Sequence, residues 1–198
     1  MSLDVNDEKS IRAFLAVDPP QEVLNEIVRI QDRLKKVVQG DIRWVRSGGI
    51  HLTLKFFGNI SESDSANISR VIKNNIVNIK PFTLNTRRVG AFPDVKRPRV
   101  LWLGMDGDTD ILISLQRAID GGLQDCGFKK EDRPFLPHLT LARIKEPKGL
   151  IGLAKIIEKS EDYTAGSFIV GGLNLFKSNL TSQGAVYTKL AYFQFAGF

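Results

Sequence analysis

One tetrapeptide occurs twice in this chain, and that repeat limits the possible folds more than any other feature of the sequence. His51-Leu52-Thr53-Leu54 returns as His138-Leu139-Thr140-Leu141, 87 residues further along (138 − 51 = 87). The chain contains two histidines, and each one opens a copy of the repeat. Both copies lie near the start of a predicted strand, so the repeat favours two similar lobes related by a pseudo-two-fold axis. In that arrangement the two strands lie side by side and both copies face one central groove.

Side-chain alternation separates the polar from the apolar residues of each copy. His51 and Thr53 share one face of their strand, and His138 and Thr140 share one face of theirs. The four leucines of the repeat then point into the core. Each copy is therefore predicted to be a small polar pair backed by apolar packing.

Two histidines and two hydroxyls are suited to phosphodiester cleavage. An imidazole with a reference pKa of about 6.5 can act as a base or an acid near neutrality. One histidine can take a proton from the attacking water while the other donates a proton to the departing sugar oxygen. Thr53 and Thr140 can supply hydroxyls that, with a cation, hold the phosphoryl oxygens. A lone histidine on a strand is usually structural, but its duplication with a threonine at the same spacing favours a shared catalytic role.

The rest of the pattern interleaves strands and helices, and it predicts an α+β fold with largely antiparallel sheets, because several strands also follow one another directly. Strands are predicted over 11–17, 42–45, 50–57, 82–90, 99–105, 138–144, 168–175 and 186–195.

Apolar residues at steps of three and four predict the helices. The first runs over 21–38 with Val37 in its buried stripe, and the second begins at a capping box formed by Ser61 and Asp64. A third is expected over 110–126, and a fourth is expected to start at Pro147. The glycine pairs at 48–49, 121–122 and 171–172 are interpreted as turns, since no Gly-rich phosphate loop is present.

Composition is that of a globular protein with a basic surface. The 198 residues include 42% hydrophobic residues, and we expect one two-lobed domain over residues 1–198. Cys126 is the only cysteine, and Met1 to Ser10 carry acidic residues where a secretion signal would be basic, so a cytoplasmic protein without a membrane span is expected. The net charge of +6 favours polyanionic partners. The clearest basic cluster comprises Arg87, Arg88, Lys96, Arg97 and Arg99.

A metal site is not favoured by the sequence. Two histidines without a nearby carboxylate leave a transition metal short of protein ligands, because Asp41 and Glu146 lie outside both repeat strands. We therefore expect neither a metal nor a cofactor.

The repeats and their surroundings resemble the two-histidine phosphoesterase superfamily. The likeness rests on His51-Leu52-Thr53-Leu54-Lys55-Phe56-Phe57-Gly58 and Pro137-His138-Leu139-Thr140-Leu141-Ala142-Arg143, with supporting matches from about Ile11 to Phe195. Within that superfamily the sequence is most similar to the RNA 2′,3′-cyclic phosphodiesterases, also called 2′-5′ RNA ligases.

The resemblance implies a bilobal α+β fold with a central groove between the two motifs. It assigns His51 as proton donor and His138 as proton acceptor, and it implies cleavage of RNA 2′,3′-cyclic phosphate ends to 2′-phosphomonoesters. Arg143 is carried over as a phosphate-binding cation, although regular strand alternation turns it away from His138 unless the strand has a bulge. Trp44, Phe57 and Trp102 are assigned to the core.

Other interpretations are left open by the sequence. Reverse chemistry, with a 5′-hydroxyl in place of water, would form a 2′-5′ linkage. A ligase of tRNA halves would need the same residues together with affinity for a large RNA. A non-catalytic nucleotide- or RNA-binding module on the same fold is a further alternative, and both intact repeats argue against it. The expected partners are RNA with cyclic phosphate ends or cyclic nucleotides, with tRNA as one candidate, and the expected state is a monomer.

Overall fold

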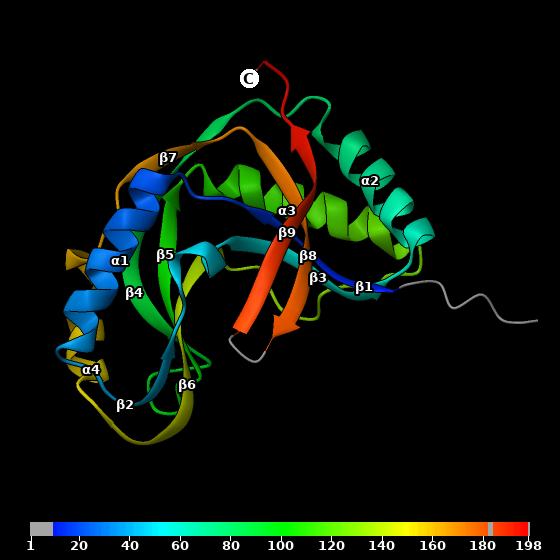
Figure 1. Cartoon of the computed structure of the whole chain (residues 1–198). Coiled ribbons are helices and arrows are strands. Elements are labelled where there is room, and N and C mark those ends of the chain that lie inside the picture. The colour runs from blue at the N-terminus through cyan, green and yellow to red at the C-terminus, as the bar shows by residue number, and fades with distance from the viewer. Residues whose placement is uncertain (1–9, 182–183, 198) are drawn as a thin grey trace, which may run out of the picture.

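Two antiparallel sheets make up the framework of the computed structural model, which describes residues 10–181 and 184–197 (Figure 1). The β1 sheet has the strand order β3 (Leu52–Ile60), β1 (Ile11–Val17), β8 (Gly172–Thr181) and β9 (Gly184–Gln194). The β6 sheet has the order β2 (Gln39–Trp44), β6 (His138–Ile151), β5 (Val100–Gly107), β4 (Phe82–Phe92) and β7 (Ser167–Val170).

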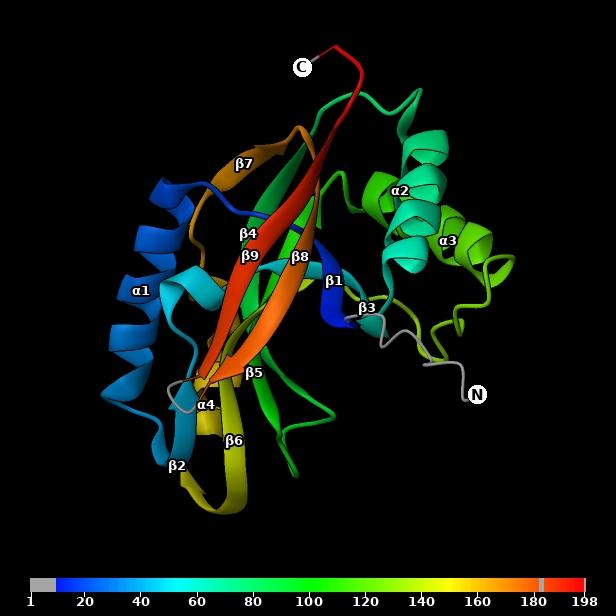
Figure 2. The ribbon, with the colours of Figure 1, turned by 45° about the vertical axis from the view of Figure 1, so that its right-hand side comes forward.

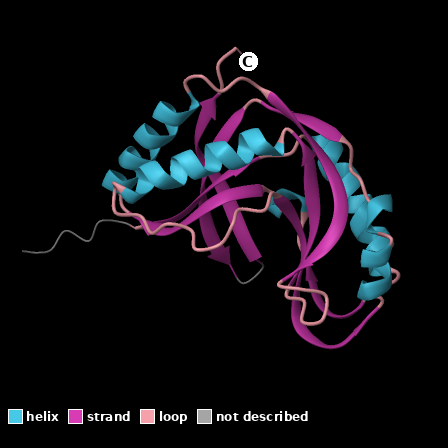
Figure 3. Cartoon of the chain, turned by 180° about the vertical axis from the view of Figure 1, so that it is seen from behind, coloured by secondary structure: helices cyan, strands magenta, loops and turns pink. Residues whose placement is uncertain are grey.

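Helices flank the two sheets on the outside, as the view from behind shows (Figure 3). Helices α1 (Gln21–Lys35) and α4 (Leu153–Glu158) lie beside the β6 sheet, and α2 (Glu62–Ile76) and α3 (Thr109–Gln124) lie against the β1 sheet. Short 3₁₀ turns occur at Ser47–Gly49 and Ser160–Asp162. The predicted α+β class with two antiparallel sheets is confirmed.

The two lobes are not the two halves of the chain. β1 is followed by α1 and β2 beside the other sheet, and the chain then returns to the β1 sheet with β3. Figure 2 shows β1 between β3 and β8, which are far apart in sequence. The repeat therefore marks a pseudo-symmetric pair of strands within interleaved lobes.

The predicted apolar stripes account for most of the core. The first three helices bury their periodic aliphatic residues, and the repeat leucines Leu52, Leu54, Leu139 and Leu141 are at most 4% exposed. The capping box at the start of α2 is present: the Asp64 backbone N–H donates to Ser61 Oγ, and the Ser61 backbone N–H donates to the Asp64 carboxylate. No helix among the described residues is long and apolar enough to cross a membrane.

Two predictions about helices were wrong. Helix α1 ends at Lys35 instead of Val38, so Val37 is 46% exposed and Val38 is buried in its place. The helix expected from Pro147 is strand: β6 continues to Ile151, and α4 starts only after Gly152. β5 begins at Val100, opposite Arg143, so the part of β6 beyond Arg143 pairs with β2 alone, and a proline is tolerated on such an edge.

Two further predictions failed at glycine pairs. Gly121-Gly122 is not a turn but lies inside α3, where Gly122 lies so close to Val71 of α2 that a side chain would be crowded. The single strand expected over 168–175 is divided at Gly171 into β7 of one sheet and β8 of the other. β8 extends to Thr181, beyond the predicted end of the strand at residue 175, and residues 182–183 lie outside the described ranges. Residues 1–9, on which the prediction about secretion depends, lie outside them as well.

Candidate active site

His51 lies immediately before β3, in a ring of aromatic side chains. Its ring centroid is 4.8 Å from that of Phe176, 5.1 Å from that of Tyr187 and 5.7 Å from that of Phe14. Its side chain is 11% exposed. Aromatic packing therefore leaves this imidazole few orientations.

A carboxylate that the sequence analysis missed orients His51. Asp18 follows the last residue of β1, and its Oδ1 lies 2.8 Å from His51 Nδ1. A carboxylate can only accept, so Nδ1 carries a proton. The other oxygen of Asp18 lies 3.2 Å from Lys189 Nζ and accepts from Asn174 Nδ2 at 3.3 Å. In the sequence, Asp18-Pro19-Pro20 indicates the end of a strand. This pattern does not indicate that Asp18 also contacts His51.

Charge and burial act in opposite directions on Asp18. Burial of the carboxyl raises its pKa, but the hydrogen bond and charge of His51, together with Lys189, lower it by more. The pKa of Asp18 consequently lies below its ordinary value, and Asp18 is ionised near neutrality. His51 Nε2 is buried and has no hydrogen-bond partner among the described residues, so it is the ring atom left for a ligand.

His138, the first residue of β6, has a different environment. Its Nδ1 lies 2.7 Å from the Leu136 carbonyl oxygen, which can only accept, so Nδ1 is the donor and the neutral ring keeps its lone pair on Nε2. Burial lowers the pKa of His138 below its ordinary value, the Leu136 hydrogen bond raises it, and the charge of Arg143 lowers it further. The ring packs against Phe92 at 4.9 Å and Trp102 at 6.4 Å between centroids.

A glycine makes room for Trp102 beside His138. Gly90 on β4 is the cross-strand neighbour of Trp102 on β5, and a Cβ on Gly90 would lie 2.2 Å from the indole ring. Trp102 therefore lies across β4 on the same face as His138. Of the three aromatic residues assigned to the core, Trp44 and Phe57 pack against it, whereas Trp102 contacts the candidate site.

A bulge in β6 places Arg143 on the His138 face. Leu141 and Ala142 are both fully buried, so alternation is interrupted between them, and the pairing with β5 shifts at the same point. After this shift Arg143 is exposed and Ile144 is buried. The strand thus contains the irregularity that Arg143 needs to share a face with His138 and Thr140.

The first repeat contains the matching bulge, and it exposes an aromatic residue. Leu54 and Lys55 are both buried, the pairing of β3 with β1 shifts there, and Phe56 is 60% exposed. Phe56 therefore occupies the position that Arg143 occupies in the second repeat. It lies next to Phe14, with 5.8 Å between ring centroids, on the face that carries His51 and Thr53. An alignment of the two repeats, extended by two residues, could have indicated this position.

Both bulges are held by a buried glutamine from the covering helix. Gln31 of α1 donates from Nε2 to the carbonyl oxygens of Leu141 at 2.9 Å and Val45 at 2.8 Å. Gln116 of α3 donates to the Leu54 carbonyl oxygen at 3.5 Å. A bulge interrupts the regular ladder, and these side-chain amides donate to backbone carbonyl groups at or beside the two bulges. The two glutamines extend the pseudo-symmetry of the repeats to the helices.

The structure brings the two repeats together. β3 contacts β6, and the Val45 backbone N–H, close to the first repeat, donates to the Leu141 carbonyl of the second repeat at 2.9 Å. Thr53 is the cross-strand neighbour of Ala16, and Thr140 is that of Trp102, so each threonine is on the face of its histidine.

Other charged and hollow regions lie apart from the histidines. In the predicted basic cluster, Arg87 pairs with Asp106 and Glu161, and Arg88 also pairs with Glu161, so these two arginines are largely neutralised.

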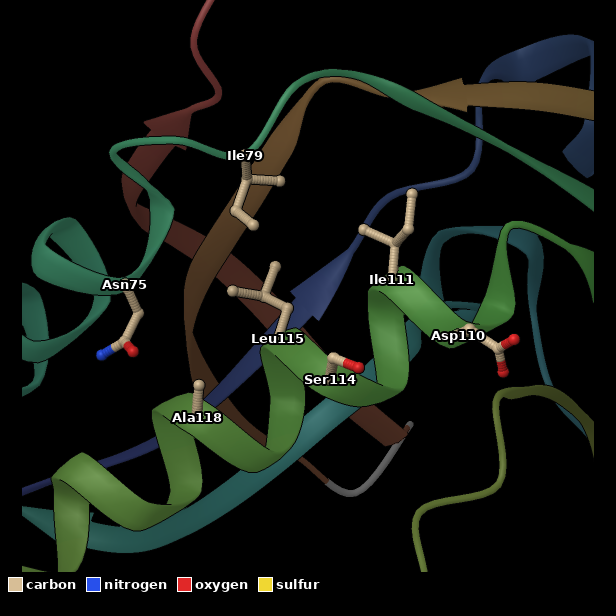
Figure 4. Close-up of a pocket in the computed structure, with 7 residues that line it drawn as sticks. All are labelled: Asn75, Ile79, Asp110, Ile111, Ser114, Leu115 and Ala118. Carbon is tan, nitrogen blue, oxygen red and sulfur yellow. The ribbon is translucent and has the colours of Figure 1, made fainter.

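Within residues 10–181 and 184–197, no group of three or more His, Cys, Asp or Glu side chains is placed to hold a metal ion. One shallow cavity lies between α2 and α3, lined mainly by apolar residues such as Ile79 and Leu115 (Figure 4). A second is lined by residues of α1 and α4 and of the segments that follow these helices, such as Val37 and Tyr163.

Comparison with known proteins agrees with this arrangement. Residues 14–181 match the 2′-5′ RNA ligase superfamily. A relative from Methanothermobacter thermautotrophicus, named RNA 2′,3′-cyclic phosphodiesterase, is 35% identical over 184 residues, which cover 93% of this chain and 98% of the relative. A relative of the same name from Aquifex aeolicus is 33% identical over 196 residues, covering 96% and 100% of the two chains.

Solved structures show the same fold. The crystal structure of TT0787 from Thermus thermophilus has a TM-score of 0.75 at 28% identity and covers 94% of this chain and 99% of that one. E. coli LigT complexed with 3′-AMP has a TM-score of 0.74 at 25% identity and covers 95% and 99%. Fold, repeated motifs and sequence identity agree, and the chain belongs to the 2′-5′ RNA ligase superfamily.

Proposed function

We propose that this protein hydrolyses 2′,3′-cyclic phosphate ends of RNA to 2′-phosphomonoesters without a metal, with His51 as proton donor and His138 as proton acceptor. The enzyme class rests on the relatives, several of which are named RNA 2′,3′-cyclic phosphodiesterase and are 30–35% identical over most of the chain.

The observation that carries the assignment of roles is the contrast between the two Nδ1 partners. The Asp18 carboxylate accepts from His51 Nδ1–H and holds the ring in place, so a proton on Nε2 is the one that can be donated to a leaving group. Burial and the charge of Arg143 favour a neutral imidazole at His138, and its Nδ1–H is donated to the Leu136 carbonyl, so the Nε2 lone pair can act as a base. Two identical motifs thereby obtain opposite functions from their surroundings.

The reaction follows from these protonation states. His138 Nε2 takes a proton from water, the water oxygen attacks phosphorus, and the bond from phosphorus to the 3′ oxygen breaks as His51 Nε2 gives that oxygen a proton. Thr53, Thr140 and Arg143 bind the phosphoryl oxygens, and their donors stabilise the charge that develops on them. The same steps with a 5′-hydroxyl in place of water would form a 2′-5′ linkage.

Phe56 supplies a platform for the terminal base. An exposed phenyl ring next to the histidine face offers stacking area to any nucleobase. E. coli LigT has been crystallised with 3′-AMP, which shows that a solved relative accepts an adenine nucleotide.

The decisive experiment is hydrolysis of a nucleoside 2′,3′-cyclic phosphate by the wild-type protein in excess EDTA, with the product isomer identified by ³¹P NMR. We expect undiminished turnover and release of the 2′-phosphate alone. Loss of turnover in EDTA, restored by added metal, would contradict the metal-free mechanism. No turnover of folded protein on either cyclic nucleotides or cyclic-ended RNA would support the binding-module alternative.

Substituting Asp18 should lower the rate. In Asp18→Asn the carboxylate that accepts from His51 Nδ1–H is replaced by a neutral amide, so the ring loses the charge-assisted hydrogen bond that orients it. At pH 7 we expect a decrease of about 10- to 100-fold, the size of a hydrogen bond to a charged group. The acid limb, set by His138 and its lowered pKa, should stay in place.

A matched control is available four residues further along. Glu22→Gln removes the same charge from an exposed position in the first turn of α1 and should leave kcat/KM unchanged. An unchanged kcat/KM in Asp18→Asn would show that Asp18 does not position His51.

A further inference from the structure

Two arginines face each other across neighbouring strands beside His138. Arg43 on β2 is the direct cross-strand partner of Arg143 on β6, and both side chains are exposed. Their sequence neighbours Ile42, Trp44 and Ala142 pack toward the core, so both arginines are on the opposite face, which carries His138 and Thr140. Directly opposed like charges destabilise a sheet unless an anion lies between or above them.

The described part of the chain does not neutralise this pair. Neither guanidinium has an acidic side chain within ion-pair distance among the described residues, in contrast to Arg87 and Arg88. Asp41, two positions before Arg43 on the same strand, pairs instead with Lys145 at 3.5 Å. This acid of the same strand is thus engaged elsewhere, and the two guanidinium groups are left for an external anion.

Given the proposed function, Arg143 is occupied by the phosphate that reacts. Arg43 is one strand further from His138, about 5 Å across the sheet. A long, exposed guanidinium at that spacing from a phosphate-binding arginine is suited to the next phosphate of a polynucleotide backbone. A cyclic mononucleotide has no such group.

We propose that Arg43 forms a second phosphate subsite, which binds the phosphodiester on the 5′ side of the terminal nucleotide. The preferred substrate is consequently an oligoribonucleotide with a cyclic phosphate end, and a cyclic mononucleotide uses only part of the site. This inference rests on the proposed function but can fail independently of it.

The test compares two substrates and two variants. Wild type, Arg43→Gln and Arg117→Gln are assayed on a nucleoside 2′,3′-cyclic phosphate and on a trinucleotide with the same cyclic end. Arg117 is an exposed arginine on α3, so its substitution removes equal charge away from the site. We expect Arg43→Gln to lower kcat/KM on the trinucleotide about tenfold, the size of one hydrogen bond to a charged group. Its rate on the mononucleotide, and both rates of Arg117→Gln, should stay within about twofold of the wild type.

A neutral linkage in the substrate sharpens the comparison. The phosphodiester on the 5′ side of the terminal nucleotide can be replaced by a methylphosphonate. The kcat/KM of the wild type should then fall by the same factor as the Arg43→Gln substitution causes. The kcat/KM of Arg43→Gln should not fall further. The salt dependence of the trinucleotide reaction should also decrease by about 0.7 in log–log slope in Arg43→Gln, as expected for one phosphate contact on a single strand.

Several results would overturn the proposal. Equal losses by Arg43→Gln on both substrates would mean that Arg43 acts on the reacting phosphate or on the strand itself. Additive losses from the variant and the methylphosphonate would mean that Arg43 does not contact that linkage. If wild type hydrolyses neither substrate, the proposed function fails. If wild type hydrolyses both and Arg43→Gln hydrolyses both equally well, only the proposed subsite is eliminated.

Discussion

His51→Ala and His138→Ala should each lower kcat/KM on a cyclic nucleotide by about 10²- to 10⁴-fold, the usual contribution of a general acid or base. Because each histidine serves the same transition state, the double variant should be little worse than either single one. His138→Ala should lose the acid limb of the pH profile, which the lowered pKa of His138 sets. Circular dichroism and thermal unfolding of each variant provide the control for folding.

A substrate with sulfur in place of the 3′ bridging oxygen would distinguish the two roles. A thiolate with a pKa of about 8.5 leaves without help from an acid. We therefore expect His51→Ala to recover most of its activity on this substrate and His138→Ala to recover none. The opposite pattern would mean that His138 is the acid and His51 the base. If neither variant recovers activity, His51 is not the acid.

Asp120→Ala should destabilise the protein by about 3–5 kcal/mol, because it leaves a buried ammonium without its counter-ion. Lys55, inside the first bulge, is 4% exposed, and its Nζ lies 2.6 Å from Asp120 Oδ1 on α3. Nζ also donates to the Lys129 carbonyl at 2.8 Å, and the Glu131 backbone N–H donates to the other oxygen of Asp120 at 3.1 Å. The pair thus joins the first repeat to the segment that leads to the second.

Urea unfolding measures this loss directly. Glu131→Ala is the matched control, since its carboxylate is 3.8 Å from the same Nζ and 47% exposed. It should change the free energy of unfolding by no more than about 1 kcal/mol. The double variant Lys55→Met/Asp120→Leu should recover most of the stability that Asp120→Ala loses, because paired apolar groups of similar size need no counter-charge. A loss below about 1 kcal/mol for Asp120→Ala would show that the ammonium reaches water in the folded state.

The sequence was sufficient for the features that depend on periodicity. The buried stripes of the first three helices apart from Val37, the Ser61 capping box and the inward leucines of the repeats follow from local spacing, and the structure confirms them. Periodicity does not determine which sheet a strand joins. The apolar run around Gly171 looks like one strand, although it passes from one sheet to the other.

The candidate site likewise contains residues that the sequence indicates and residues that only the fold reveals. His51, His138 and the two threonines are visible in the sequence because they repeat, and their catalytic roles remain predictions until the variants are measured. Asp18 is not repeated, and its contact with His51 depends on the pairing of β1 with β3. The orientation of Arg143 depends on a bulge, which alternation alone cannot indicate.

Because β1 lies between β3 and β8, its sheet can be completed only late in synthesis on the ribosome. Ala13 on β1 pairs with Lys177 on β8, so one edge of β1 stays open until most of the chain has been synthesised. At roughly 5–20 residues per second, that edge remains exposed for on the order of 10 s. Phe176 and Tyr187, which surround His51, emerge at the same late stage. A nascent chain stalled before β8 would therefore carry both histidines, an unfinished site and an open apolar strand edge prone to aggregation.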